Sequence, residues 1–449
     1  MIDEYLSPED TRSWPPDLPC GGRAAATGRT RRRMETTGQW HGSQWLGRRG
    51  PIGCVALEIT QRCNLDCTLC YLSESSEAVR DLPIDIIFRR IDLIADTYGP
   101  GANVQITGGE PTLRNRGDLI AICRRLVERG LKPALFTNGI RADRACLAEL
   151  AAAGLVDVAF HVDMTQQRPG YRNEAALNDV RTEYIERARG LGIAVMFNTT
   201  IFAGNRGDVP MLARFFADNA DVVGLASFQP HAAVGRGVED GPPDAISADD
   251  VVAAIDAGLG CRLPVGAVQH GHARCNRYGI VLVAGGRAAP IVADKRFAAA
   301  MIAAGGAMDP DLRDKSRALR EIVNWLSRRP LLWPGVAVWV VGRLWALRRG
   351  LWSGRFRVRK LSFYVHDFMD SSRLERDRLE ACSFMVATEG GMVPMCLHNA
   401  RRDDFILTPV KTAANTFWNP ATGREALEPG AGAVTLNRKT AKGRARRAF

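Results

Sequence analysis

Between residues 53 and 228, short apolar runs alternate along the chain with longer segments in which apolar residues recur every three or four positions. A short apolar run bounded by turn residues is typical of a buried strand, whereas the three-to-four spacing places apolar side chains on one face of a helix. The runs predict strands at 54–60, 103–107, 133–137, 156–162, 193–201 and 222–228. The segments between them predict helices at 84–99, 118–129, 143–153, 176–190 and 210–218.

This alternation predicts an α/β fold built from six strand–helix units. Strands that alternate with helices through short loops form a parallel sheet with right-handed crossovers. Six units suit a partial (β/α)6 barrel of the TIM type or a doubly wound sheet. In either architecture ligands bind at the C-terminal ends of the strands, and the polar motifs of this chain follow its strands at those ends.

Composition divides the chain into five regions. Residues 1–49 are rich in Pro, Gly and Arg and are expected to form a weakly ordered basic arm. The six units occupy residues 50–238. Residues 239–360 predict a linker and helical region, residues 361–410 a motif-rich region within an irregular C-terminal extension, and residues 411–449 a basic tail.

The charge and the cysteines restrict the class of protein. A net charge of +11 favours an acidic partner such as nucleic acid, an anionic membrane or a phosphorylated substrate. The eleven cysteines are clustered, and residues 1–30 contain no apolar run of the kind found in a secretory signal. These features predict a cytoplasmic protein whose cysteines serve metal or redox chemistry instead of disulfide bonds.

Three cysteines, Cys63, Cys67 and Cys70, lie in the loop that follows the first predicted strand. Their C-x3-C-x2-C spacing allows three thiolates to ligate three irons of a 4Fe–4S cluster, which leaves the fourth iron open. A structural zinc ion normally needs a fourth ligand close by, and the nearest histidine, His41, lies before the first strand. A zinc site and three incidental cysteines remain the alternatives.

The motif “TGGEP” at residues 107–111 follows the second predicted strand. Together with the cysteine spacing, it resembles the radical S-adenosylmethionine (SAM) superfamily, and the resemblance covers residues 50–238. One departure is Leu69, because the residue before the third cysteine is often aromatic in that family. The resemblance implies that the open iron binds SAM and that a reducing donor of the flavodoxin or ferredoxin type supplies an electron. SAM would then be cleaved to a 5′-deoxyadenosyl radical.

The resemblance also implies a set of SAM contacts at the strand ends. They are Gly108, Gly109 and Glu110 for the methionine moiety, Asp163 for the ribose region, and Asn138 and Asn198 at the third and fifth strands. Glycine lets a backbone approach a ligand closely, and a carboxylate suits an ammonium group. A polar residue at a strand end can instead cap the next helix. His161 lies inside a strand pattern and is expected to be an interior histidine with satisfied hydrogen bonds.

Two further segments, “SFQPHAAVGRG” at 227–237 and residues 366–400, resemble the branch that includes tetraether and membrane-spanning lipid synthases. In that branch the second segment holds an auxiliary iron–sulfur centre. The resemblance implies a candidate second cluster with the ligands Cys275, Asp367, Cys382 and Cys396. Asp367 stands where the branch has a cysteine, and carboxylate is the weaker cluster ligand. An Asp-ligated cluster, a different metal, a lost cluster and plain buried cysteines therefore all remain open.

Residues 322–360 contain no acidic residue, nine basic residues and five of the nine tryptophans. Tryptophan and arginine favour the interface of an anionic membrane, so this segment predicts a peripheral contact with the inner membrane face. Its apolar run is interrupted by Pro334 and Arg343 and is expected to be too short to span a bilayer. A buried core helix with solvated basic flanks is the alternative.

The sequence thus predicts a radical SAM enzyme that modifies a C–H bond of a lipid or another hydrophobic substrate, with no specific nucleic-acid partner. One alternative is a radical SAM enzyme that modifies a peptide or protein. Another is a zinc-binding nucleic-acid or scaffold protein, which would leave “GGEP” and the six strand–helix units unexplained.

Overall fold

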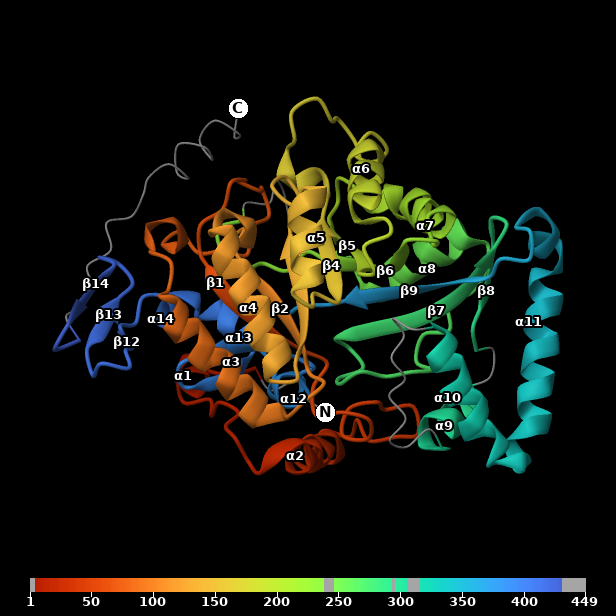
Figure 1. Ribbon diagram of the computed structural model, residues 1–449, viewed down its shortest axis with the longest axis horizontal. Helices are drawn as coiled ribbons and strands as arrows, with labels where there is room; N and C mark the ends of the chain where they lie inside the picture. Colours follow the sequence, from red (N-terminus) through yellow and green to blue (C-terminus); the bar gives the residue numbers. More distant parts are fainter. Residues whose placement is uncertain (1–4, 238–245, 293–294, 305–314, 430–449) are drawn as a thin grey trace.

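The computed structural model describes residues 5–237, 246–292, 295–304 and 315–429, so the predicted boundary at residue 238 lies outside the described residues. Its centre is an eleven-stranded sheet in the order β11-β10-β1-β2-β3-β4-β5-β6-β9-β7-β8 (Figure 1). The strands are β1 Cys54–Thr60, β2 Asn103–Gly108, β3 Lys132–Thr137, β4 Asp157–His161, β5 Ala194–Ile201, β6 Val223–Pro230, β7 Asn276–Ala284, β8 Arg287–Pro290, β9 Arg359–His366, β10 Phe384–Thr388 and β11 Gly391–Pro394. The strands from β10 to β9 in this order are parallel, and β11, β7 and β8 pair antiparallel at the two edges.

The six predicted strand–helix units are present, which confirms the α/β fold class. The helices that follow β1 to β6 are α3 Ile84–Tyr98, α4 Arg116–Glu128, α5 Arg144–Ala152, α6 Asn178–Ala188, α7 Val209–Asp218 and α8 Ala248–Leu259. In Figure 1, α3, α4 and α5 lie side by side across the front of the sheet. The sheet stays open between β11 and β8, so it is a partial barrel.

Helix α3 shows how the local sequence produces this packing. Ile87, Ile91 and Ile94 recur at helical spacing, and all three are fully buried in the core against the sheet. Gly99 ends the helix with a φ of 73°, a left-handed conformation that favours glycine, and its N–H donates to the Ala95 carbonyl at 2.8 Å.

The C-terminal third adds strands to both sides of the six-unit core. β9 pairs in parallel with β6, and β10 pairs in parallel with β1. The sequence predicts a motif-rich region within an irregular extension here and not these strands, because their pairing partners lie far away in the chain. The helices outside the core units are α1 Pro8–Arg12, α2 Gly22–Thr36, α9 Lys295–Ala304, α10 Lys315–Ser327, α11 Trp333–Ser353, α12 Arg376–Glu380, α13 Met395–Ala400 and α14 Arg402–Ile406.

Residues 5–49 are folded against the core, which differs from the predicted weakly ordered arm. Helix α2 packs beside α3 and buries Met34 completely. The carboxylate of Asp17 is buried and accepts hydrogen bonds from Arg33 Nη1 and from the Tyr98 hydroxyl, both at 3.0 Å. The arginine-rich composition suggested a solvated segment, but this buried acid and the small residues of α2 give the arm tertiary contacts.

The first part of the predicted basic tail is also folded. β12 (Val410–Lys411), β13 (Phe417–Asn419) and β14 (Arg424–Ala426) form a small antiparallel sheet. Trp418 is buried there against Ile86 of α3, which explains why this stretch is ordered. Residues 430–449 lie outside the described residues.

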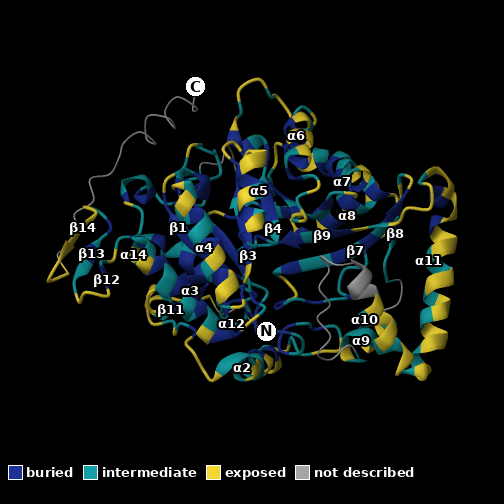
Figure 2. Ribbon diagram, viewed as in Figure 1, coloured by how far each residue is buried: buried dark blue, intermediate teal, exposed yellow. Residues whose placement is uncertain are grey.

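Helix α11 stands at the edge of the molecule and is largely exposed (Figure 2). Its buried residues are Leu347, Gly350 and Leu351, so it is not the buried core helix considered as an alternative. With the preceding turn it forms a 24-residue segment that is long and apolar enough to cross a membrane, judged by length and composition alone. The prediction that the run is too short was wrong because Pro334 occupies the first helical turn, where proline is tolerated.

Candidate active site

The three cysteines of the loop after β1 converge on one cavity. Cys63, Cys67 and Cys70 all line a space of about 220 Å³ at the C-terminal ends of the parallel strands. The loop is tied to the segment after β4, because the Thr68 N–H donates to the Thr165 carbonyl at 2.8 Å. The predicted cluster ligands therefore lie together at the edge where this fold places ligands.

The electrostatics of these thiols show that they are close together. Burial raises the pKa of Cys63 to about 11 and that of Cys67 well above its ordinary value. The neighbouring thiols add to both effects, with Cys70 the strongest neighbour of Cys67. Thiolates at such a site need positive charge beside them, which the irons of a cluster supply.

The three thiols are not placed to bind one single metal ion together. No three or more His, Cys, Asp or Glu side chains in the described part of the chain are placed to hold a metal ion together. In a 4Fe–4S cluster each iron takes its own thiolate, so the three ligands need not meet at one point. One loop with three half-buried thiols facing a shared cavity fits that arrangement.

The two glycines after β2 hold this strand end against the cysteine loop. A Cβ on Gly108, which has a φ of 130°, would lie 1.9 Å from the Thr60 carbonyl oxygen, and a Cβ on Gly109 would lie 2.1 Å from that of Arg62. The Gly109 N–H donates to the Thr60 carbonyl at 2.8 Å. The close approach that requires glycine is therefore to the backbone of the cysteine loop, and both glycines also line the cavity.

Glu110 is almost completely buried, and its carboxylate is already hydrogen-bonded. It accepts from the Thr112 N–H at 3.0 Å, the Thr137 hydroxyl at 2.7 Å and the Asn138 N–H at 2.7 Å. The Asn138 amide in turn donates to Asn64 Oδ1 at 2.7 Å. Glu110 and Asn138 line the cavity, as predicted for SAM contacts, and Glu110 also fixes the backbone of the third strand end.

Asp163 lies behind the cavity wall with none of its side chain exposed. Its carboxylate accepts from the N–H groups of Thr165 (3.0 Å) and Thr200 (2.8 Å) and lies 2.6 Å from His161 Nε2. Asp163 is predicted to contact the ribose region of SAM; in the structure His161 lines the cavity and Asp163 lies behind it, and the ribose contact stays a prediction. Burial would lower the pKa of His161, yet the Asp163 carboxylate raises it above its ordinary value.

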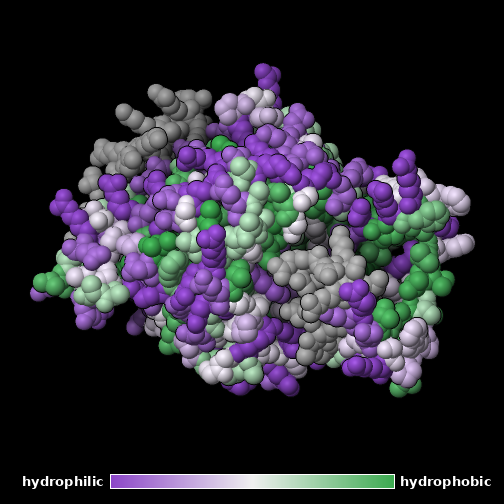
Figure 3. All heavy atoms as spheres, in the orientation of Figure 1, coloured by the Kyte–Doolittle hydropathy of each residue, from purple (hydrophilic) through white to green (hydrophobic). Residues whose placement is uncertain are grey.

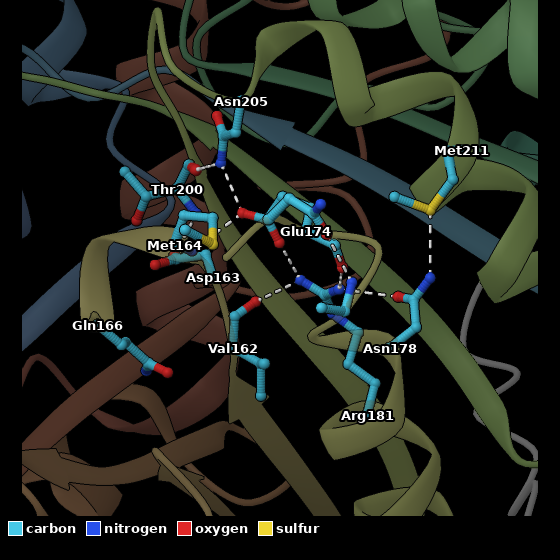
Figure 4. A network of polar contacts seen from close by, with 12 residues as sticks. Val162, Asp163, Met164, Gln166, Glu174, Asn178, Arg181, Thr200, Asn205 and Met211 are labelled. Carbon is cyan, nitrogen blue, oxygen red and sulfur yellow. Dashed lines mark hydrogen bonds and ion pairs between the residues drawn. The ribbon is translucent and has the colours of Figure 1, made fainter. Parts of the chain in front are cut away.

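A buried network fixes the chain behind Asp163 (Figure 4). Glu174 and Arg181 form an ion pair in which neither side chain is exposed. Arg181 also donates to the Val162 carbonyl at 2.8 Å, and Glu174 accepts from the Asn205 amide at 2.8 Å. Buried pairs need such additional hydrogen bonds, and here they hold the end of β4 against the loop after β5.

The rest of the cavity is lined mainly by apolar residues from distant parts of the chain. Asn198 of β5 contributes a polar group, as predicted. The apolar side chains come from the cysteine loop, from β3, from the segment after β6 and from the C-terminal region: Leu65, Leu69, Leu72, Phe136, Pro230, Val234, Phe368, Phe384 and Met395. Sequence patterns could not identify the last three as site residues, because β10 and α13 reach the cavity only through long-range pairing.

A second buried pair lies beside the cavity and connects β1 to α14. Arg402 Nη1 lies 2.8 and 2.9 Å from the two carboxylate oxygens of Glu58, a residue that lines the cavity. Gln61 donates to the same carboxylate at 2.7 Å, and Arg402 Nη2 donates to Asn399 Oδ1 at 2.8 Å. The C-terminal region is thus joined to the first strand by charge as well as by strand pairing.

The turn at residues 235–237 packs directly on the cysteine loop. The N–H groups of Arg236 and Gly237 donate to the Cys70 carbonyl at 3.1 and 3.0 Å. A Cβ on Gly235 would lie 2.4 Å from the Tyr71 carbonyl group, so this turn requires glycine. No site residue was predicted in this turn, although Arg236 between two glycines is a signal that the sequence carries.

The four candidate ligands of the C-terminal site are near one another and near Arg378. The Asp367 N–H donates to the Cys275 carbonyl at 2.8 Å, and Arg378 donates to Cys275 Sγ at 3.2 Å and to the Asp367 carbonyl at 2.7 Å. Burial raises the pKa of Cys275, Cys382 and Cys396, and neighbouring thiols raise the last two further. The fold brings the set together, and its role as a metal site stays a prediction.

Comparisons with known proteins match part of this chain. The model of the radical SAM superfamily matches residues 57–216. The 7,8-dihydro-6-hydroxymethylpterin dimethyltransferase of Methanocaldococcus jannaschii is 29% identical over 187 residues, which are 40% of this chain and 36% of that protein. The PqqA peptide cyclase of Methylobacterium nodulans is 29% identical over 177 residues, 36% of this chain and 42% of that protein.

A probable GTP 3′,8-cyclase of Pyrococcus abyssi is 31% identical over 168 residues, 37% of this chain and 53% of that protein. The chain therefore spans about a third to a half of the length of these relatives. Among solved structures, SuiB of Streptococcus suis aligns with a TM-score of 0.36 and 16% identity over 45% of each chain. The match to the superfamily includes the cysteine triad and all six predicted SAM contacts, and it ends before Arg236 and the C-terminal set.

Proposed function

We propose that residues 57–216, which match the model of the radical SAM superfamily, form a radical SAM domain, and that the whole protein is an enzyme that cleaves SAM reductively and modifies a C–H bond of its substrate. Enzymes of this superfamily use a 4Fe–4S cluster, SAM and an external reductant, and a flavodoxin or ferredoxin is the proposed donor here. The observation that carries the proposal is the convergence of Cys63, Cys67, Cys70 and the Gly108–Glu110 turn on one cavity.

The residues of this chain have distinct parts in that reaction. When bound and reduced, the cluster supplies the electron that cleaves SAM into methionine and a 5′-deoxyadenosyl radical. The three thiolates hold it, and the glycine turn keeps the cysteine loop in place. Asn138, directly after β3, and Asn198, within β5, line the cavity with their amide groups and are the proposed polar contacts to SAM. His161, oriented by Asp163, offers positive charge to an anionic group in the cavity.

A hydrophobic substrate suits the remaining wall of this cavity. Phe368, Phe384 and Met395 line it together with leucines of the cysteine loop, so an alkyl chain could lie beside the radical without meeting unsatisfied polar groups. A lipid that enters from a membrane on the cytoplasmic side is our preferred substrate class. Methylation and C–C coupling are both compatible with this placement.

A peptide substrate is the second candidate, and it is favoured by one observation. The PqqA peptide cyclase of Methylobacterium nodulans, whose name states a peptide substrate, is 29% identical to this chain over 177 residues. A peptide would have to present one side chain to the same apolar wall. Product formation from lipid extracts and from peptide libraries separates the two classes.

Anaerobic reconstitution with iron and sulfide tests the core of the proposal. We expect an EPR-active 4Fe–4S cluster after reduction with dithionite and formation of 5′-deoxyadenosine from SAM, both lost in Cys67→Ala. Deoxyadenosine formation by Cys67→Ala would overturn the proposal, and bound zinc without iron or sulfide would revive the zinc-protein alternative. Iron that persists in a triple variant of Cys63, Cys67 and Cys70 would reveal a second cluster at Cys275, Cys382 and Cys396.

A further inference from the structure

An exposed apolar stripe runs along α11 at the outer edge of the molecule (Figure 3). Val338, Val341, Trp345 and Trp352 are 75%, 66%, 68% and 78% exposed, respectively. Their spacing of three, four and seven residues places them on one face of the helix. Contiguous apolar surface of this kind on a soluble protein marks an interaction site.

The opposite face of α11 is packed on the edge of the sheet. Leu347 and Leu351 are buried against β7 and β8, and a Cβ on Gly350 would lie 2.1 Å from the Ala284 carbonyl oxygen. The Trp339 indole N–H points inward and donates to the Ile291 carbonyl at 2.5 Å. Crossing a bilayer would require α11 to leave these contacts, whereas lying on a bilayer surface would preserve them.

The surroundings of the stripe carry positive charge. Residues 322–360 include nine basic and no acidic residues. The Arg348 guanidinium lies over the Trp345 ring, 4.2 Å from its centroid. We propose that α11 docks this protein on the surface of an anionic bilayer, with the stripe in the headgroup region and the arginines on lipid phosphates.

Co-flotation with vesicles tests this docking. We expect binding to vesicles of phosphatidylcholine with phosphatidylglycerol and little binding to phosphatidylcholine alone. Binding should weaken when salt rises from about 0.1 to about 1 M, because the screening length falls from about 10 to about 3 Å. Changing Trp345 and Trp352 to Ala should weaken binding by about tenfold or more. A matched control changes Leu18 and Leu427, exposed apolar residues outside α11, to Ala and should bind like the wild type.

Three results would overturn surface docking. One is absence of flotation, or flotation that the tryptophan substitutions leave unchanged. A second is binding that survives 1 M salt and alkaline carbonate, which would indicate a membrane span. The third is a dimer in light scattering that the same substitutions abolish while flotation is absent, which would assign the stripe to a second copy of this chain.

A different observation concerns Arg236, which is buried beside the cysteine triad. Its side chain is 1% exposed, and its Nη1 pairs with Glu77 at 3.0 Å. Its Nε and Nη2 have no hydrogen-bond partner within the described residues, although Asp66 lies 3.9 Å from Nη2. The Arg236 N–H donates to the Cys70 carbonyl at 3.1 Å and to the Leu72 carbonyl at 2.8 Å, so the residue lies directly on the cysteine loop.

We infer that Arg236 is a positioning residue that acts on the thiolate-bound cluster through its fixed, buried charge. This inference rests on the proposed function. Glu77 and Asp66 are anionic partners of Arg236, and because its Nε and Nη2 make no hydrogen bond within the described residues, a cluster held by three thiolates would be a further anionic acceptor beside the guanidinium. One electron from a low-potential donor makes the cluster more negative by one charge, with no proton or ligand lost. A fixed cation beside it therefore favours the reduced form and raises the reduction potential.

A redox titration followed by EPR on anaerobically reconstituted protein tests this role. Arg236→Gln removes the charge, and we expect at least a tenfold shift of the reduction equilibrium, which is about 59 mV toward negative potential for one electron. Arg236→Lys keeps the charge and should remain close to the wild type. Arg116→Gln is the matched control, because it removes an equal charge from an exposed site on α4.

The outcomes separate this inference from the proposed function. A wild-type protein that binds no cluster would sink the proposed function and this inference with it. A wild-type cluster whose potential and iron content are unchanged in Arg236→Gln would overturn the role of Arg236 alone. Loss of iron from both Arg236→Gln and Arg236→Lys would show that Arg236 is needed for folding of the turn, and this result would also overturn its proposed role in the reduction potential.

Discussion

Replacing Arg402 with methionine should destabilise the folded protein by about 3–5 kcal/mol. The Arg402 and Glu58 side chains are 2% and 4% exposed, and two contacts of 2.8 and 2.9 Å join Nη1 to the carboxylate oxygens. Methionine removes the positive charge but fills a similar volume. The variant therefore leaves a buried carboxylate without its counter-charge, and the cost of that desolvated charge sets the size of the effect.

The lowered pKa of Glu58 leads independently to a similar free energy of stabilisation. Burial would raise this pKa, but Arg402, followed by His398 and Gln61, lowers it from 4.5 to about 2. A lowering of this size corresponds to about 3 kcal/mol of folding free energy. Because the folded-state pKa is the lower one, the stabilisation is complete above pH 4.5 and is lost as the pH falls toward 2.

Urea denaturation at pH 7, followed by tryptophan fluorescence, measures the free energy of unfolding. A cycle of Glu58→Gln, Arg402→Met and the double variant should give a coupling of about 3 kcal/mol. The matched control is Arg116→Met, whose exposed pair with Glu149 at 3.2 Å should be worth less than about 1 kcal/mol. A coupling near zero, or a loss below about 1 kcal/mol in Arg402→Met, would refute the reasoning.

Three further predictions concern the cavity. Gly108→Ala should lower the free energy of unfolding by about 2 kcal/mol or more and reduce iron uptake, because the new Cβ would lie 1.9 Å from the Thr60 carbonyl oxygen. The control is Gly190→Ala, which should retain iron, because Gly190 has a φ of 79° and no atom lies within 4 Å of the new Cβ. His161→Gln should reduce the change of the thermal midpoint with pH between pH 6 and 9. The raised folded-state pKa of His161 gives the wild type a stabilisation that is lost as the pH rises above 6.5. The same slope of midpoint against pH in the wild type and the variant would contradict this. Cys67→Ser should bind less iron than the wild type in a colorimetric assay, and equal iron would remove Cys67 from the ligand set.

The periodic part of the fold could be predicted because each element carries its own pattern. β1 spans the predicted residues 54–60, and α3 ends one residue before the predicted position 99. β9 and β10 could not be recognised as part of the same sheet, since Phe384 finds its partner at Cys54 and no local pattern encodes that pairing. The folded arm before residue 50 was missed for the same reason, because its helix is stabilised by contacts with α3.

Some residues of the site could be predicted from local sequence, and others could not. The cysteine triad could be predicted because its three ligands occupy eight residues of one loop. Arg236 could not, because it reaches Cys70 only through the turn after β6. The different positions of His161 and Asp163 relative to the cavity have a local cause. The strand ends at His161, whose side chain lines the cavity, while Asp163 begins the next turn and accepts its N–H groups.

The pairing of β10 with β1 and of β9 with β6 has a consequence for the chain during its synthesis. Ribosomes deliver the N-terminal part first, and once residue 238 has emerged the strands β1 to β6 and the helices α3 to α7 exist, while β1 and β6 are still uncovered edges. Uncovered edge strands are templates for association with other chains. The edges close only when residues 359–388 arrive. A fragment of residues 50–238 is therefore expected to aggregate when made alone, although it contains the whole region shared with the superfamily.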